Sequence, residues 1–217
     1  MPKVLLKSKQ KKRNCLSVFL FFSFIILQAQ NKIVIAYGDQ IHLGNVPEDT
    51  RFEIHGPKSL WLKGNKINQF HFDKPGIYTL KVDEKKHPEA DCARLHLPSE
   101  IVVEVSPVKM TFGQPLEFSS PIVKNKETRG ITLKVPVVIQ TYDHSPAVLN
   151  RAPVASAGIG SNIVAQLKTE ATSLSEGTHF LEYSLNGIAT ENAYLMFDFV
   201  DANGKIQSIS LVTPVKN

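Results

Sequence analysis

Three side chains with metal-binding chemistry lie close together in the segment Lys85–Pro98. They are His87, Cys92 and His96, in the spacing His-x4-Cys-x3-His. Imidazole nitrogen and thiolate sulfur are good ligands for copper and zinc, so this segment is a candidate metal site. The same residues also fit a charged loop that carries one small thiol. We favour the loop, and we therefore predict no bound metal and no other cofactor.

The Cys/His segment resembles the metal loop of cupredoxins, because both lie between two strands. In cupredoxins the cysteine directly follows the strand, whereas Cys92 comes ten residues after Val82. Leu97 and Pro98 stand where those proteins place an axial Met. A cupredoxin-like metal binder that uses His87, Cys92 and His96 is therefore an alternative function and not the main prediction.

A second group of candidates lies in the 22-residue connection Thr141–Asn162. Connections of that length are often functional, and Tyr142, His144 and Arg151 are the side chains in it that suit ligand contact. Asp143, His144 and Ser145 are consecutive, so their side chains cannot form a hydrolytic relay, which needs groups from separate positions. We predict binding residues here and no catalytic ones.

Trp61 is the only tryptophan, and Leu60 and Leu62 flank it. Aromatic rings stack on sugars in many exported β-sandwich modules, so Trp61 is a candidate binding platform by analogy with them. A Trp within an alternating strand is more often core or half-buried. The sequence pattern therefore favours a buried or half-buried Trp61.

The elements that position these residues are short strands. Alternating runs rich in Val, Ile, Phe, Tyr and Thr are separated by Gly, Pro, Asn and Asp, a pattern typical of β-structure. The expected strands include Lys32–Tyr37, Arg51–His55, Ser59–Lys63, Ile77–Val82, Ile101–Val105, Lys109–Phe112, Leu116–Phe118, Ile131–Ile139, Ile163–Thr169, His179–Leu185, Tyr194–Val200 and Lys205–Val212. Pro136 predicts an edge strand or a bulge, and Asp201–Gly204 predicts a hairpin turn and not a calcium loop.

The segment Phe70–Val82 carries a resemblance to a known fold. It resembles the PKD and immunoglobulin-like modules of exported bacterial proteins, which show an aromatic residue, a Pro-Gly turn and Tyr-x-Leu-x-Val. The matching residues here are Phe72, Pro75, Gly76, Tyr78, Leu80 and Val82. The resemblance implies a sandwich in which the Tyr hydroxyl bonds to backbone at a corner and the ring packs in the core.

The spacing of strands predicts an all-β protein with two immunoglobulin-like β-sandwiches in tandem. Ser106-Pro107 is the best boundary, so residues 31–106 would form the first sandwich and residues 107–217 the second. If Tyr78, Leu80 and Val82 share one face of their strand, that face is the more apolar one and should point into the core.

The first 30 residues have the features of a secretory signal peptide. A basic run at Lys7–Arg13 precedes a 12-residue apolar run, Leu16–Leu27, and then Gln28-Ala29-Gln30. The apolar run is shorter than the roughly 20 residues of a membrane-spanning helix, so we predict cleavage near Ala29. The mature chain would be periplasmic or extracellular, without a membrane span.

The positive charge is concentrated in that same segment. Six of the 25 Lys and Arg residues precede Leu16, and residues 1–30 contain no Asp or Glu. The remaining 19 basic residues face 20 acidic ones, a net charge of −1. Nucleic-acid binding needs a surplus of Lys and Arg on the folded surface, so nucleic acid is not expected as a partner.

These observations favour a non-enzymatic exported protein that acts as a binding, adaptor or assembly module. Its expected partner is another envelope protein or a glycan, contacted through sheet edges and loops. Besides the metal binder, a carbohydrate-binding accessory protein that uses Trp61 or the Tyr142 segment is an alternative.

Overall fold

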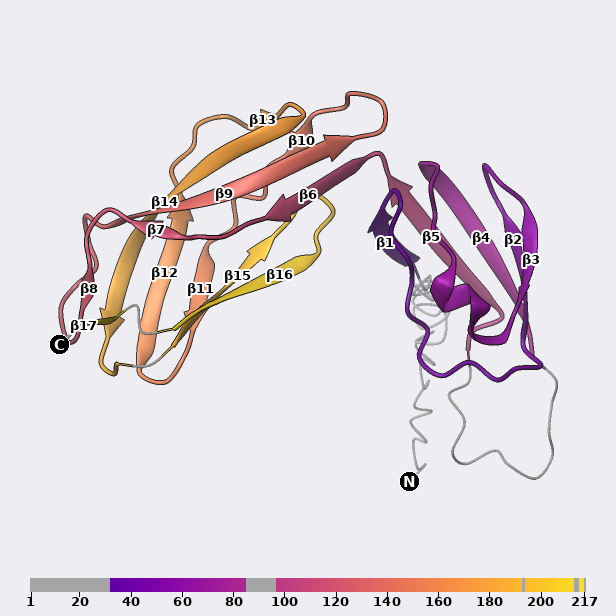
Figure 1. Cartoon of the computed structure of the whole chain (residues 1–217), viewed down its shortest axis with the longest axis horizontal. Helices are drawn as coiled ribbons and strands as arrows, with labels where there is room; N and C mark the ends of the chain where they lie inside the picture. The colour runs from indigo at the N-terminus through magenta and orange to yellow at the C-terminus, as the bar shows by residue number, and fades with distance from the viewer. Residues whose placement is uncertain (1–31, 85–96, 193, 213–214, 217) are drawn as a thin grey trace, which may run out of the picture. The chain divides into compact units, whose positions relative to one another are not determined.

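The computed structural model describes residues 32–84, 97–192, 194–212 and 215–216. As predicted, the described chain is almost entirely β-structure, with strands joined by turns and loops (Figure 1). The single helix among the described residues is a short 3-10 helix, η2 (Gly64–Gln69), which the sequence pattern did not predict. No helix in this part of the chain is long and apolar enough to cross a membrane.

The first five strands form one sheet in the order β1-β5-β4-β2-β3. The outer strand β1 runs parallel to β5, and the other neighbours are antiparallel. The bounds of the strands are Lys32–Ala36 for β1, Arg51–His55 for β2, Leu60–Lys63 for β3, Gly76–Asp83 for β4 and Glu100–Ser106 for β5.

One face of this sheet carries a hydrophobic core. Alternate residues of the strands point into it, and Tyr78 and Leu80 on β4 are fully buried, as the alternation of that strand predicts. The core is completed by residues outside the strands, among them Ile41, Ile67 and Phe72. The segment between β1 and β2, together with η2 and Phe72, therefore supplies part of the layer that covers the sheet.

Asparagine side chains fasten that covering segment. The Leu43 N–H donates to Asn68 Oδ1 at 2.9 Å, and the Val46 N–H donates to Asn65 Oδ1 at 3.0 Å. Asn68 Nδ2 also donates to the Gly44 carbonyl oxygen at 2.8 Å. Backbone groups that have no strand partner are thereby satisfied, which is what a partly buried irregular segment requires.

The later strands form an eight-stranded sheet in the order β16-β15-β11-β12-β14-β9-β6, with β7 also paired to β9. Two short pairs, β10 with β13 and β8 with β17, lie outside it. The bounds are Val108–Phe112 for β6, Glu117–Phe118 for β7, Ile122–Val123 for β8, Thr132–Thr141 for β9, Ala147–Val148 for β10, Val154–Ala157 for β11, Ser161–Leu167 for β12, Ser173–Leu174 for β13, Gly177–Ala189 for β14, Leu195–Val200 for β15, Ile206–Leu211 for β16 and Val215–Lys216 for β17.

Strand β11 is where this sheet folds over. Val154 and Ala155 pair with β12, whereas Ser156 and Ala157 pair with β15. A strand that changes partners along its length turns a corner between two layers, and the layers enclose a second core of buried side chains from β6 to β17. The arrangement is β-sandwich-like, in agreement with the predicted fold class.

The two cores are formed by stretches of the chain on either side of Ser106-Pro107. The first includes Val105 and the second begins with Val108, while residues 31–217 group by backbone proximity as one compact unit. The division into separate sandwiches at residues 106 and 107 therefore stays a prediction.

Two local expectations are wrong. Pro136 does not lie on an edge strand, because β9 is paired on both sides, with β14 and with β6 and β7. The alternative, a bulge in β9, is not seen in its pairing with β14, which runs residue for residue from Thr132 to Ile139. Instead the neighbouring strand is interrupted next to it, between β6 and β7, and the Gly113 N–H donates to the Pro136 carbonyl oxygen at 2.8 Å. The segment Thr141–Asn162 is not one long loop, because it contains β10 and β11.

Candidate functional site

Trp61 lies on β3, an edge strand of the first sheet, with 65% of its surface exposed. Leu60 and Leu62 pack partly against the first core, and the alternation of a strand then points Trp61 to the opposite face. The expectation of a buried or half-buried Trp61 is therefore wrong. The reason is that the strand buries its leucines, and the tryptophan takes the other face.

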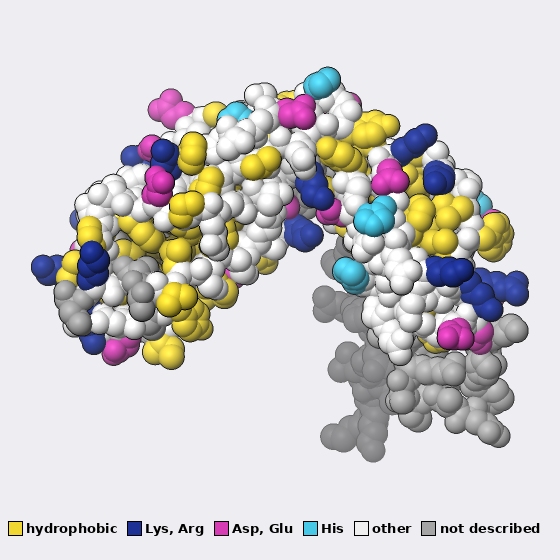
Figure 2. Space-filling view, in the orientation of Figure 1, with side chains coloured by type: hydrophobic (Ala, Val, Ile, Leu, Met, Phe, Trp, Pro, Cys, Tyr) yellow, Lys and Arg dark blue, Asp and Glu magenta, His cyan; other side chains and the backbone are white. Residues whose placement is uncertain are grey.

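Basic side chains surround the exposed tryptophan. A shallow hollow is lined by Trp61, Leu62 and Lys63 of β3, by Arg51 of β2 and by Lys66 of η2. We call these five residues the Trp61 surface. Arg51 lies directly opposite Lys63 in the β2–β3 pairing, so both cations lie in one cross-strand row beside the ring. Figure 2 shows Lys and Arg side chains beside hydrophobic ones over β2 and β3.

Acidic residues border the Trp61 surface without lining it. Glu53 lies opposite Trp61, and its Oε1 lies 3.1 Å from His55 Nε2. Asp83 of β4 lies opposite Arg51. Among the residues that the structure describes, the hollow itself is lined by three cationic side chains and no carboxylate, so the groups that a ligand would touch there favour an anion.

Tyr142 and His144 lie at the surface after β9. The Tyr142 ring makes an edge-on contact with Tyr37, with centroids 5.8 Å apart, and the side chain of His144 is 91% exposed, with Nδ1 lying 3.4 Å from Glu176 Oε2. Asp143 accepts a hydrogen bond from the Ser145 N–H at 3.1 Å. Hydrogen bonds from Ser145 lower the pKa of the Asp143 carboxyl group, so this segment carries an ionised carboxylate at neutral pH.

Arg151 has a structural role in the described chain. Its Nη2 donates to the carbonyl oxygens of Thr169, Glu170 and Ala171 at 2.8, 2.6 and 2.9 Å. These bonds fasten the turn that follows β12 to the segment that precedes β11. A guanidinium group occupied in this way has fewer donors left for a ligand, so the suggested binding role of Arg151 remains a prediction only.

The predicted binding residues do not form one site. Trp61 lines its hollow with Arg51 and Lys63, whereas Tyr142, His144 and Arg151 do not line it. His87, Cys92 and His96 lie outside the described residues, so the metal hypothesis stays a prediction. Among the residues that the structure does describe, no three His, Cys, Asp or Glu side chains gather as metal ligands do.

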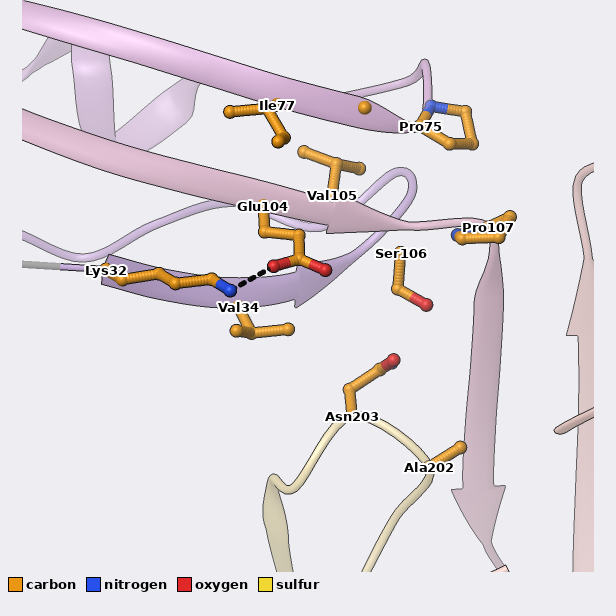
Figure 3. A pocket seen from close by; sticks show the side chains of 11 residues that line it. Lys32, Val34, Pro75, Ile77, Glu104, Val105, Ser106, Pro107, Ala202 and Asn203 are labelled. Carbon is orange, nitrogen blue, oxygen red and sulfur yellow. Dashed lines mark ion pairs between the residues drawn. The ribbon is translucent and has the colours of Figure 1, made fainter. Parts of the chain in front are cut away.

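A second hollow is shown in Figure 3, lined by residues of β1, β4 and β5 and by Ala202 and Asn203. Lys32 and Glu104 form an ion pair along one wall. Because the two charges neutralise one another, this wall does not select an ion, and Asn203 uses its amide to donate to the Val108 carbonyl oxygen at 2.8 Å. The hollow is a less favourable site for a charged ligand than the Trp61 surface.

Asp201 is held as the predicted hairpin requires. Its Oδ1 accepts hydrogen bonds from the Asn203 and Lys205 N–H groups at 2.8 and 2.9 Å. Its Oδ2 accepts from Gln207 Nε2 at 3.0 Å. The Asp201 carboxylate is thus occupied by hydrogen bonds from the β15–β16 turn and from β16.

Sequence reasoning found Trp61 but missed its basic neighbours. Lys63 could have been found from the sequence, because it lies two residues after Trp61, and residues two apart share one face of a strand. Arg51 and Lys66 belong to other elements, and only the β2–β3 register and the position of η2 bring them to the ring.

Comparison with known proteins assigns no family. No protein-family model matches the chain, and no curated protein sequence matches it. Among solved structures, domains 4 and 5 of the S-layer protein SbsC align with 16% identity over 83% of this chain and 87% of theirs, with a TM-score of 0.25. The Yersinia pseudotuberculosis adhesin InvE aligns with 11% identity over 84% of this chain and 56% of its own, with a TM-score of 0.26. Values this low do not identify a shared fold.

Proposed function

We propose that this chain is an exported, non-enzymatic binding module of the cell envelope that contacts its partner through the Trp61 surface. The observation that carries the proposal is the 65% exposure of the only tryptophan, which lies on an edge strand with three cations beside it. A large aromatic side chain left in water forgoes on the order of 2 kcal/mol of burial free energy, which a partner that covers it would recover.

The composition of the surface also supports binding. Tryptophan and arginine are the residues most enriched among those that dominate interface energetics, and here they come from adjacent strands of one sheet. A sheet is a rigid support, so their relative positions are set before a partner arrives, which lowers the entropic cost of association.

The basic and apolar runs before Gln28 support export. Mass spectrometry of protein purified from the native envelope should find an N-terminus near Gln30 or Asn31. Protein that retains Met1–Leu27 would contradict the predicted cleavage.

Envelope binding is tested by retention of the purified mature chain on envelope fractions. Trp61→Ala should reduce retention at least about fivefold, as expected when a central aromatic contact is lost. Tyr194→Ala is the matched control, because Tyr194 is also half exposed but lies outside the Trp61 surface. Equal retention of both variants and of the unaltered chain would refute the role of Trp61, and no retention of any of them would refute the function.

A further inference from the structure

We propose that the Trp61 surface takes a carboxylate-bearing polysaccharide. This inference rests on the proposed function and adds the chemical class of the ligand. It depends on three properties of the surface, namely an exposed flat ring, cations beside that ring, and the position of the ring on an edge strand of the described sheet.

The exposed ring suits a sugar. Trp61 points away from a sheet whose opposite face holds the core, so one broad apolar surface is presented to solvent. A pyranose ring offers a matching apolar face of C–H groups, and burying both surfaces is favourable in proportion to the area removed from water. The hollow is shallow and open, which suits a chain of sugars more than a single enclosed molecule.

The cations specify an anionic polymer. Arg51 and Lys63 lie opposite one another, and Lys66 lines the same hollow from η2. A guanidinium group presents paired donors that match the two oxygens of a carboxylate. A polymer that repeats its carboxylates can meet all three cations in succession, while neutral parts of its rings lie on Trp61.

A peptide strand fits the same edge less well. Trp61 and Lys63 pair with Glu53 and Arg51, and the Gly64 N–H donates to the Thr50 carbonyl oxygen at 2.9 Å. Since ladder bonds alternate along an antiparallel pair, only Trp61 and Lys63 of the β3 residues turn their backbone groups to the outer edge, so an added strand would find few partners. Lysine on an edge strand opposes the addition of a further strand, and β3 has only four residues.

The single tryptophan makes the test direct, because all tryptophan emission comes from the proposed site. The mature chain is titrated with polygalacturonate, and quenching of Trp61 by acrylamide is measured. Saturating polygalacturonate should lower the quenching constant about twofold or more. Raising the salt concentration should weaken binding, because exposed charges are screened within about 8 Å at physiological ionic strength.

Variants separate the ring from the charges, with affinity measured by calorimetry. Trp61→Ala should weaken polygalacturonate binding about tenfold or more, while Arg51→Gln and Lys63→Gln should each weaken it about two- to fivefold. Lys126→Gln, an exposed cation outside the surface, is the control and should leave the affinity unchanged.

Competing polymers identify the class of ligand. Neutral dextran should bind at least about tenfold more weakly than polygalacturonate, and so should polyglutamate, which carries carboxylates without sugar rings. The proposed ligand class would be overturned if dextran, polyglutamate or dextran sulfate bound as tightly as polygalacturonate. It would also be overturned if saturating polygalacturonate left the quenching of Trp61 unchanged. If polygalacturonate fails to bind while envelope retention still depends on Trp61, this inference fails and the proposed function stands. If, in addition, the unaltered chain is not retained on envelope fractions, both this inference and the proposed function are refuted.

Discussion

Tyr78 is the residue on which the first core depends most clearly. Its side chain is 1% exposed, its ring contacts Phe72 at 5.0 Å in an edge-on geometry, and its hydroxyl donates to the Lys74 carbonyl oxygen at 2.9 Å. The bond runs back four residues, across the turn that precedes β4. This is the arrangement that the resemblance to immunoglobulin-like modules implied for this tyrosine.

We expect Tyr78→Ala to lower the free energy of unfolding by about 3–5 kcal/mol, because the ring fills the centre of the first core. Tyr78→Phe should cost only about 1 kcal/mol, since it removes the hydrogen bond to Lys74 and keeps the ring. Chemical denaturation followed by circular dichroism measures both. If Tyr78→Phe lowers the free energy of unfolding as much as Tyr78→Ala does, the ring is not the main contribution of Tyr78 to stability.

Alkaline pH should destabilise the protein through two buried tyrosines. Burial raises the pKa of Tyr78, with a further contribution from the Asp73 carboxylate, and burial alone raises the pKa of Tyr183, both from an ordinary value of 10.0. At a pH that ionises both hydroxyls in the unfolded chain, the folded state still keeps them neutral. Their contribution is therefore complete below about pH 10 and is lost above it.

Denaturation at a series of pH values from about 8 to 11 measures this loss around the ordinary tyrosine pKa. The double variant Tyr78→Phe, Tyr183→Phe should lose less stability over that range than the unaltered chain. An identical pH dependence in the two proteins would assign the alkaline loss to other groups.

At the scale of elements, one side chain joins the two ends of the eight-stranded sheet. Gln207 of β16 accepts a hydrogen bond from the Phe112 N–H at 3.0 Å and donates to the Met110 carbonyl oxygen at 2.7 Å. Phe112 and Met110 lie on β6, at the other end of the strand order. The side-chain amide thus takes the place of a peptide group and satisfies two backbone groups at the edge of β6.

We expect Gln207→Leu to cost about 1–3 kcal/mol, because it leaves the Phe112 N–H and the Met110 carbonyl without their partner. Ser210→Ala on the same strand is the control, since Ser210 is exposed and such changes stay within about 0.5 kcal/mol. Thermal unfolding of both variants provides the measurement. Equal melting temperatures would show that this contact does not stabilise the sheet.

Gly187 is required by the close pairing of β14 and β12. Its φ is +129°, and a Cβ atom added there would lie 1.8 Å from the Asn162 carbonyl oxygen. That contact is with backbone, which cannot move aside without disturbing the ladder.

We expect Gly187→Ala to cost at least about 3 kcal/mol, because it adds a steric clash to an unfavourable φ. Gly204→Ala is the matched control, because Gly204 also has a positive φ, +79°, but no atom of the described residues lies within 4 Å of its added Cβ. The control should cost about 1–2 kcal/mol. Similar unfolding free energies for the two variants would show that the strands separate easily at Gly187.

At the scale of the whole molecule, the chain builds two hydrophobic cores in sequence order. All residues of the first core precede Ser106, and all residues of the second follow Pro107. A core formed from one continuous stretch of chain is the usual mark of a unit that folds alone.

We therefore predict that fragments 31–106 and 107–217 fold separately, each with a cooperative unfolding transition and β-type circular dichroism. The longer fragment should be the more stable, because it buries the larger core. Amide hydrogen exchange of each fragment, compared with the mature chain, is the measurement. A fragment whose amides exchange at unfolded rates would show that the two cores depend on one another.

The sequence by itself determined the class of fold and the facing of individual strands. Alternation placed Tyr78 and Leu80 inward, and Asp201–Gly204 predicted the β15–β16 hairpin, because both signals are carried by residues close together in the chain. For Trp61 the same alternation was available, but hydrophobicity outweighed it, and the ring was wrongly expected to be buried or half-buried.

Apart from that hairpin, only the tertiary structure decided which strands became neighbours. It placed Arg51 beside Lys63, set Pro136 where the adjacent strand is interrupted, and brought Gln207 to the edge of β6. Strand alternation has a period of two residues and is therefore local, whereas pairing and register depend on contacts between residues far apart in the chain. The candidate tryptophan was accordingly visible in the sequence, and the charged surface around it emerged only on folding.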